Sequence, residues 1–294
     1  MQENNLKKVI LEKVVEKKEL KSLSKEYLDE ELNNFILENK KLWEKVKDKY
    51  ATNADKIQKS KEFKTIIKSI RTRLRAIFGV FYLKGFENTE KLINSITPNN
   101  KEIITFEILK LHRSSKERLR DYEEIYDKIY EITKIRPKII LDLACGYNPF
   151  SYYFIRESFQ YDPDYICCDI GKKDIYLINK FFQNAEINGK AIYCDLRNNI
   201  NVMKKFNADI CFMFKTLDSL DTNSNNASNI LTKKILKEIK TKYFIVSFAS
   251  KSIGGNKTIN KKKRTWFYKL LQELSFSYEE FSIHNELFIV VKKS

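Results

Sequence analysis

The chain has 294 residues, of which 43% are hydrophobic, and it contains 7 glycines and 4 prolines. This composition excludes disordered and collagen-like proteins. Its formal net charge is +16, and positive charge attracts polyanions because each neutralised phosphate releases counterions. Nucleic acid is therefore the first partner to consider, although an AT-rich genome that writes lysine for other polar residues would give the same composition.

The cysteines and the N-terminal segment indicate the cellular compartment in which the protein is expected. The five cysteines are odd in number and lack paired CxxC spacing, so we expect neither a disulfide framework nor a metal site. The opening segment MQENNLKKVILEKVVEKKEL is too charged for a signal peptide, and no apolar run approaches the roughly 18 residues that a membrane span needs. We expect a cytoplasmic protein that does not enter a membrane.

Apolar residues recur at helical spacing over residues 1–132, which predicts a basic, all-helical N-terminal domain. The clearest stripe predicts a helix from Lys56 to Leu83. A second helix is predicted from Ser114 to Tyr130, with Ser114 or Ser115 as its N-cap. Residues 1–55 are interpreted as a divergent extension of this domain.

From residue 133 to the end, short β-rich runs alternate with helical patterns at Asp174–Glu186, Ile230–Ile239 and Thr265–Leu274. Such alternation predicts βαβ units, whereas the last two runs are too close for a crossover and must form an antiparallel hairpin. We expect an α/β fold, a Rossmann-like class I methyltransferase domain with a seven-stranded, mostly parallel sheet over residues 133–294. The predicted strands are Lys138–Leu143, Tyr165–Ile170, Lys190–Cys194, Ala208–Phe214, Lys242–Phe248, Glu280–His284 and Glu286–Lys292.

The first of these strands leads into a turn that indicates a cofactor. Asp142 lies near its carboxyl end, and Gly146 allows a ligand to approach the backbone closely. A single glycine, in place of a spaced GxGxxG set, favours the methionine part of S-adenosylmethionine over a dinucleotide pyrophosphate. The alternative is another Rossmann-like nucleotide binder.

Acidic residues also end the next two strands. Asp169 is placed to accept hydrogen bonds from ribose hydroxyls, and Asp195 or the neighbouring Leu196 amide to meet the adenine edge. Either acid alone is more often a solvated turn residue, but the three strand ends together predict a cofactor site. The predicted cofactor-binding residues from this part of the chain are Asp142, Gly146, Asn148, Asp169, Ile170, Asp195 and Leu196.

The fourth strand ends in FKTLDSLD, which places Lys215 beside the expected position of the methyl group. Many amino methyltransferases carry a proline-aromatic motif such as NPPY here, and it is absent. A ring nitrogen such as guanine N7 already presents an in-plane lone pair, so it needs positioning but no general base. Lys215 is the candidate for that positioning, and the alternative is a solvated strand-end lysine.

Basic residues support RNA binding. Between Lys56 and Arg120 the sequence has 16 lysines and arginines against 6 acidic residues. Folded RNA is recognised largely by shape and backbone, so these side chains are candidates for phosphate contacts, with a solvated helix face as the alternative. The segments 221–229 and 250–264 are interpreted as surface loops, the second also meeting RNA. The predicted RNA-binding residues are Lys64, Lys68, Arg71, Arg73, Arg75, Lys251, Lys257, Lys261, Lys262, Lys263 and Arg264.

Several segments resemble the 16S ribosomal RNA guanine-N7 methyltransferases of the ArmA and Rmt aminoglycoside-resistance group. The matching segments are RTRLRAIFGVFY, LHRSSKERL, IILDLACGYNPF, CCDI, DICFMFKTLDSLD, VSFASKSIGG and NELFIVVKK. The resemblance implies a helical domain that grips the small ribosomal subunit and a catalytic domain that methylates a decoding-site guanine. It also implies that Arg118, in the family's KER motif, contacts the cofactor carboxylate. The alternative for Arg118 is a helix-surface arginine paired with Glu117 or Asp121.

The chain departs from the family at three positions near the substrate. Asp218 replaces a proline, Ala249 replaces another, and NKTINKKKRTWF lacks the family's KGMExxY-like stretch. Two alternatives therefore stay open: methylation of another rRNA or tRNA nucleotide, and a non-catalytic ribosome-binding or assembly protein that retains the fold. We expect a monomer whose partner is 16S rRNA or the small subunit.

Overall fold

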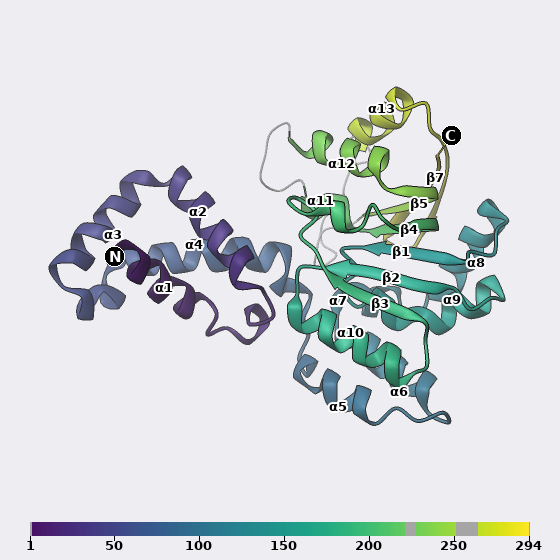
Figure 1. The fold of residues 1–294 in the computed structure, drawn as a ribbon, viewed down its shortest axis with the longest axis horizontal. Coiled ribbons are helices and arrows are strands. Elements are labelled where there is room, and N and C mark those ends of the chain that lie inside the picture. Colours follow the sequence, from purple (N-terminus) through teal and green to yellow (C-terminus); the bar gives the residue numbers. More distant parts are fainter. Residues whose placement is uncertain (1, 221–226, 251–263, 294) are drawn as a thin grey trace. The chain divides into compact units, whose positions relative to one another are not determined.

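The computed structural model describes residues 2–220, 227–250 and 264–293. The chain divides into two compact units, one of residues 1–82 and 170–173 and the other of residues 83–169 and 174–294 (Figure 1). This boundary precedes the predicted one at residue 132, because residues 83–132 belong to the same compact unit as the sheet. The lysine-rich residues 251–263, and with them Lys251, Lys257, Lys261, Lys262 and Lys263, lie outside the described residues.

The first unit is helical and has its own apolar core. Its helices are α1 (Gln2–Val14), α2 (Lys25–Glu38), α3 (Lys40–Thr52) and α4 (Lys61–Ile77). The prediction of one helix from Lys56 to Leu83 was too long. The hydroxyl of Ser60 accepts a hydrogen bond from the Phe63 amide at 3.2 Å, so α4 begins after this N-cap, and short 3-10 segments flank it.

Four helices lead into the sheet of the second unit: α5 (Thr89–Asn94), α6 (Lys101–Leu109), α7 (Arg113–Arg118) and α8 (Tyr122–Thr133). The predicted single helix from Ser114 to Tyr130 is wrong, because the chain leaves helical geometry between α7 and α8. Ser115 is not an N-cap; its hydroxyl donates to the carbonyls of Leu109 and His112 at 2.7 and 3.0 Å. This break separates α7 from the regular amphipathic pattern of α8.

The second unit contains a seven-stranded sheet in the order β3-β2-β1-β4-β5-β7-β6. The strands β1 to β5 run parallel, and β7 pairs antiparallel with both β5 and β6. All seven predicted strands and the terminal hairpin are confirmed, with ends that differ by a few residues. The observed strands are β1 (Ile139–Leu143), β2 (Asp164–Asp169), β3 (Gly189–Tyr193), β4 (Asn207–Phe214), β5 (Lys240–Ala249), β6 (Ser277–Ile283) and β7 (Glu286–Lys292).

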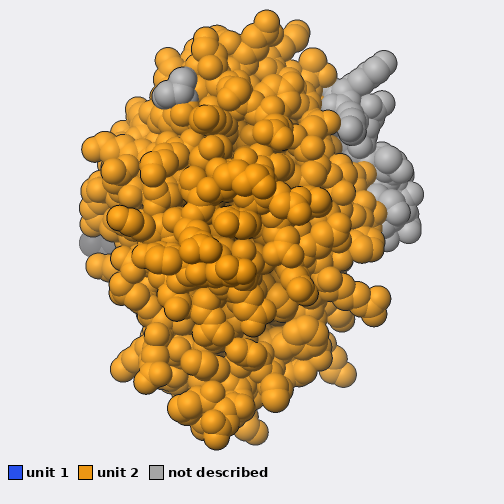
Figure 2. Space-filling view, turned by 90° about the vertical axis from the view of Figure 1, so that its right-hand side faces the viewer, with its two compact units in different colours: residues 1–82, 170–173 blue, residues 83–169, 174–294 orange. Residues whose placement is uncertain are grey.

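Helices cover both faces of the sheet, as Figure 1 shows. On one face, α12 (Ala227–Glu238) and α13 (Thr265–Glu273) share a core with alternate strand residues. On the other, α8, α9 (Tyr152–Phe159) and α10 (Lys172–Asn184) pack through aromatic side chains. The short helix α11 (Thr216–Leu220) follows β4. Figure 2 shows one face of this unit in space-filling form.

Two further sequence predictions concern loops and membranes. Of the predicted loop 221–229, residues 227–229 belong to α12, and residues 221–226 lie outside the described part of the chain. Among the described residues, no helix is both long and apolar enough to cross a bilayer.

Candidate functional site

The sheet order reverses beside β1, which lies between β2 and β4, and ligands of open α/β sheets bind at such a reversal. The turn after β1 is held against β2 by two hydrogen bonds. The Cys145 amide donates to the Cys168 carbonyl at 2.9 Å, and the Gly146 amide donates to Oδ2 of Asp169 at 2.9 Å. The structure therefore brings together Gly146 and Asp169, two of the residues predicted to bind the cofactor.

Gly146 meets two requirements that favour glycine. Its φ of +51° lies in the left-handed region, and a Cβ at this position would come within 3.3 Å of Cε1 of His112. The His112 ring is buried and stacks on Tyr147 with their centroids 4.9 Å apart, so it has little room to move. Burial, together with the nearby charges of Arg118 and Lys215, lowers the pKa of His112 to about 3, so the ring is neutral near pH 7.

Replacing Gly146 with alanine is expected to lower the free energy of unfolding by about 1 kcal/mol, because alanine is strained at positive φ. It is also expected to weaken binding of S-adenosylhomocysteine, measured by calorimetry, since the new methyl group displaces His112 or the turn. Gly85→Ala is the matched control, because Gly85 also has positive φ (+92°) but an added Cβ there has no neighbour closer than 3.6 Å. Equal affinity losses in the two variants would contradict this role of Gly146.

Asp142 and Asn148 lie beneath the turn. The Asp142 carboxylate is 1% exposed, and its Oδ2 accepts hydrogen bonds from Asn148 Nδ2 at 3.0 Å and from the Tyr165 hydroxyl at 2.7 Å. Burial raises the pKa of Asp142 to about 7, although both hydrogen bonds oppose that shift. Both residues were predicted to bind the cofactor, and that role stays a prediction; the structure shows them bonded to each other, with the Asn148 backbone amide donating to the carbonyl of Cys145 in the turn at 2.9 Å.

The raised pKa of Asp142 makes stability depend on pH. In the unfolded chain this carboxyl titrates near 3.8, so between about pH 4 and pH 7 the folded protein binds more protons and the free energy of unfolding falls as pH rises. Asp142→Asn removes this titration. The difference in Tm, variant minus wild type, is expected to increase between pH 5 and pH 8, and a difference that stays flat would contradict the assignment.

The predicted acids follow two adjacent strands: Asp169 is the last residue of β2, and Asp195 comes two residues after the end of β3. Asp169 ends β2, and its carbonyl accepts a hydrogen bond from the Cys194 amide, just beyond β3, at 3.0 Å. Asp195 follows and is 8% exposed; its carboxylate accepts from the guanidinium of Arg197, with Nη2 at 2.8 Å. Leu196 is buried, and Ile170 belongs to the first unit and packs against its apolar core.

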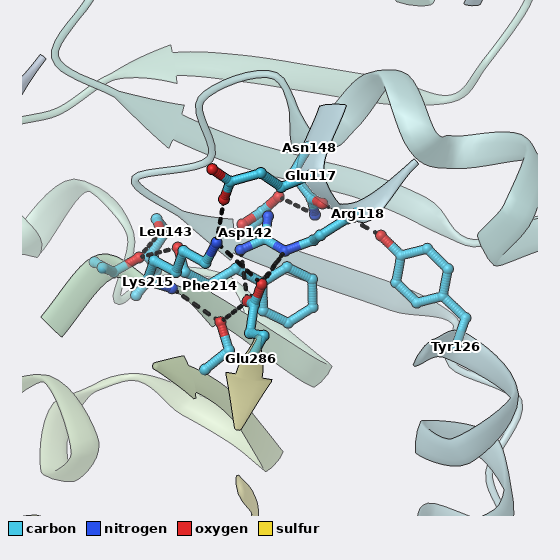
Figure 3. Close-up of polar contacts among 11 residues, drawn as sticks. Glu117, Arg118, Tyr126, Asp142, Leu143, Asn148, Phe214, Lys215 and Glu286 are labelled. Carbon is cyan, nitrogen blue, oxygen red and sulfur yellow. Dashed lines mark hydrogen bonds and ion pairs between the residues drawn. The ribbon is translucent and has the colours of Figure 1, made fainter. Parts of the chain in front are cut away.

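Arg118 is buried and does not pair as a helix-surface arginine. Its Nε and Nη2 donate to the carboxylate of Glu286 at 2.7–3.1 Å, and its guanidinium lies over the ring of Phe214, 4.9 Å from the centroid (Figure 3). The alternative pairing with Glu117 or Asp121 is therefore wrong. Glu286 is the first residue of β7, which places this pair at the same edge of the sheet as the turn after β1.

Lys215 follows β4 and joins the same cluster. Its Nζ lies 2.9 Å from Glu117 and 3.3 Å from Glu286, and its φ of +54° is in the left-handed region (Figure 3). Its backbone amide donates to Oγ of Ser247 at 3.0 Å. Lys215 is thus a partly buried, doubly paired lysine rather than a solvated strand-end residue.

The basic residues predicted on α4 differ in their contacts. Lys64 and Lys68 are exposed. The arginines are held within the first unit: Arg71 donates to main-chain carbonyls at the end of α1, Arg73 pairs with Glu38, and Arg75 donates to Glu19 at 2.6 and 2.8 Å. The lysines are therefore the better probes of RNA contact, because changing the arginines also removes contacts between helices.

Arg264 is the first described residue after the lysine-rich segment 251–263. Its side chain is 3% exposed, it donates to the carbonyl of Ala249, and its guanidinium lies 4.8 Å from the centroid of the Phe248 ring. This buried position differs from the RNA-facing one that was expected. The apolar surroundings and the carbonyl partner make Arg264 a link between the end of β5 and the start of α13.

Sequence reasoning missed Glu286 and His112. Glu286 is the one acidic residue in the otherwise apolar run ELFIVV. An ionisable residue at the start of a buried strand needs a partner, so this pattern could have indicated a functional or ion-paired position. His112 lies in the segment LHRSSKERL, but nothing in that segment singles it out as a site residue. Its contact with the cofactor turn depends on how α7 folds back on β1, which no local pattern predicts.

Comparison with known proteins supports this geometry. A family model described as ribosomal RNA methyltransferase (FmrO) matches residues 60–291. A 16S rRNA (guanine(1405)-N(7))-methyltransferase of Proteus mirabilis is 31% identical over 207 residues, which cover 65% of this chain and 70% of that protein. An enzyme of the same description from Serratia marcescens is 25% identical, covering 79% of this chain and 84% of that one.

A solved structure shows the same fold. The 16S rRNA methyltransferase RmtF in complex with S-adenosyl-L-homocysteine superposes with a TM-score of 0.71 at 20% identity and covers 98% of both chains. This coverage reaches into residues 1–55, which the sequence alone left without a counterpart.

Proposed function

Since the chain belongs to the ribosomal RNA methyltransferase (FmrO) family, we propose that it transfers a methyl group from S-adenosylmethionine to N7 of a guanine in the decoding region of 16S rRNA. The family and the class I fold make it a methyltransferase. The observation that carries the proposal is the hydrogen bond between the Gly146 amide and the Asp169 carboxylate. It lies where the strand order of the sheet reverses, so a ligand bound there would contact both the backbone of the turn and this carboxylate. The names of the relatives support the choice of nucleotide and atom.

The residues at this edge fit an adenosyl cofactor. Gly146 takes the positive φ of the turn beside the buried His112 ring, and the Asp169 carboxylate, fixed by the Gly146 amide, is placed to accept from ribose hydroxyls. The Leu196 amide and Asp195 border the adenine position, and a guanidinium such as that of Arg118 suits a carboxylate. The cofactor supplies an electrophilic methyl group, and the protein orients the acceptor in line with it.

The described site supports chemistry without a general base. A guanine N7 attacks with a lone pair in the ring plane and carries no proton, so no group has to remove one. His112 is neutral and buried behind the turn, and Lys215 is held by two carboxylates. Lys215 then positions the target guanine or an adjacent phosphate of the RNA. This role agrees with the absence of the NPPY motif, which many amino methyltransferases carry at this place.

Lys64 and Lys68, with the lysines of residues 251–263, are proposed to contact the RNA backbone, because exposed ammonium groups bind phosphate without sequence preference. We further propose that the protein acts as a monomer in the cytoplasm, where small subunits are found.

The proposed activity is tested by incubating the protein with S-adenosylmethionine carrying a labelled methyl group and, separately, 30S subunits, 50S subunits and protein-free 16S rRNA. Label is expected in 16S rRNA and not in the 50S sample. Absence of label from all three, with cofactor binding intact, would favour a ribosome-binding protein without turnover. Label in tRNA added as a fourth sample would favour another nucleotide.

A further inference from the structure

Glu286 is the centre of a buried ion cluster that the proposed reaction does not by itself require. Its side chain is 7% exposed, yet its carboxylate meets Arg118, Lys215 and Ser247 (Figure 3). Burial would raise the pKa of Glu286, but the charges of Arg118 and Lys215 outweigh it and hold the pKa below the ordinary value. The group is therefore a carboxylate. A buried ion pair adds little to the free energy of unfolding compared with apolar residues of similar size. The presence of this cluster therefore indicates a role other than stability.

The hydrogen bonds of the pair use one edge of the guanidinium, and the side chain of Tyr122 also interacts with Arg118. All three hydrogen bonds from Arg118 to Glu286 use Nε and Nη2. A guanidinium has five N–H donors in one plane, and its Nη1–Nη2 edge can form a bidentate pair of hydrogen bonds with a second carboxylate. Glu286 and the ring of Phe214, 4.9 Å from the guanidinium carbon, fix the orientation of that plane.

The carboxylate is itself held in place by the ends of two strands. The Ser247 hydroxyl of β5 donates to Glu286 and accepts from the Lys215 amide at 3.0 Å, directly after β4. Lys215 keeps a left-handed φ there, and such strain is retained where the surrounding structure requires it. These contacts hold the Glu286 carboxylate in one position against Arg118.

We propose that Glu286 is a positioning residue for the cofactor: it holds Arg118 by the Nε–Nη2 edge so that the adjacent Nη1–Nη2 edge receives the carboxylate of the methionine part of the cofactor. This inference rests on the proposed function, because it assigns Arg118 to that carboxylate. It adds a residue of β7 to a site otherwise built from α7 and the ends of β1 to β4.

Glu286→Gln tests the inference. In the wild type, both carboxylate oxygens of Glu286 accept a hydrogen bond from Nε of Arg118. The glutamine side chain has an NH2 group in place of one oxygen, so in either orientation of its amide this NH2 group faces the N–H group of Arg118. Two donors repel each other, and the guanidinium of Arg118 is expected to turn away. S-adenosylhomocysteine is expected to bind about tenfold more weakly by calorimetry, whereas 5′-methylthioadenosine, which lacks the carboxylate, changes by less than about twofold. Glu238→Gln is the matched control, since Glu238 ends α12 and pairs with Lys204 at 2.5 Å; it precedes the start of β5, whereas Ser247 lies near the other end of that strand.

A double-mutant cycle with Arg118→Lys separates positioning from a merely structural role. If Glu286 acts through Arg118, the lysine variant costs less affinity for S-adenosylhomocysteine in the Glu286→Gln background than in the wild type. Equal losses for both ligands, additive losses in the cycle, or unchanged or tighter binding of S-adenosylhomocysteine would each overturn the proposal. A wild-type protein that binds neither ligand would instead overturn the proposed function.

Discussion

Asp169→Ala is expected to weaken binding of S-adenosylhomocysteine by on the order of 100-fold, because hydrogen bonds to a charged group contribute about 1.5–3 kcal/mol each. The carboxylate ends β2 and is proposed to accept from the ribose hydroxyls. It also accepts the Gly146 amide at 2.9 Å, so its removal leaves that amide without its partner and loosens the turn. Titration calorimetry measures the loss directly.

The control for this variant is Asp164→Ala, which removes a carboxylate from the opposite end of the same strand. Its affinity for the ligand is expected to equal that of the wild type, and thermal unfolding of both variants checks that they fold. If Asp169→Ala bound the ligand as tightly as the wild type, the cofactor would not lie at the carboxyl ends of β1 and β2.

The second large effect is expected in ribosome binding. Reversing the charge of both exposed lysines of α4, Lys64→Glu with Lys68→Glu, should weaken binding to 30S subunits by on the order of 100-fold near 0.1 M salt. Two lost phosphate contacts should also reduce the slope of log affinity against log salt by about 2. Equilibrium binding at several salt concentrations measures both quantities, while affinity for S-adenosylhomocysteine is expected to stay unchanged.

Lys40→Glu with Lys41→Glu changes the net charge by the same amount and serves as the control. These lysines are exposed at the start of α3 and precede residues 60–291, which match the family model. They are expected to alter affinity much less. Equal losses for the two pairs would mean that overall charge, and not contact by α4, governs binding.

The sheet could be predicted almost completely because its strands are short apolar runs separated by clear helical patterns. The hairpin followed from the short connection between β6 and β7, which leaves no room for a crossover. The break between α7 and α8 could not be predicted, because residues 113–121 contain no proline or glycine to mark it. At the break, Arg118 bonds a residue 168 positions away, while Ser115 bonds back to the carbonyls of Leu109 and His112.

The candidate site was predicted in its composition but not in its pairing. Asp142 and Asn148 have the sequence position of ligand-binding residues, yet they bond to each other because the strand end buries them. Similarly, the charge of Arg75 is visible in the sequence, whereas its bonds to Glu19, 56 residues away, depend on the packing of α4. Local patterns locate strand ends, but long-range contacts decide which charges remain available.

The central claim is tested most directly by mapping the methylated atom. 16S rRNA from 30S subunits treated with the protein and S-adenosylmethionine is reduced with borohydride and cleaved with aniline, which breaks the chain at N7-methylguanosine. Primer extension is expected to show one new break at a guanine of the decoding region, absent when the cofactor is omitted. Incorporated methyl label without such a break would contradict methylation at N7.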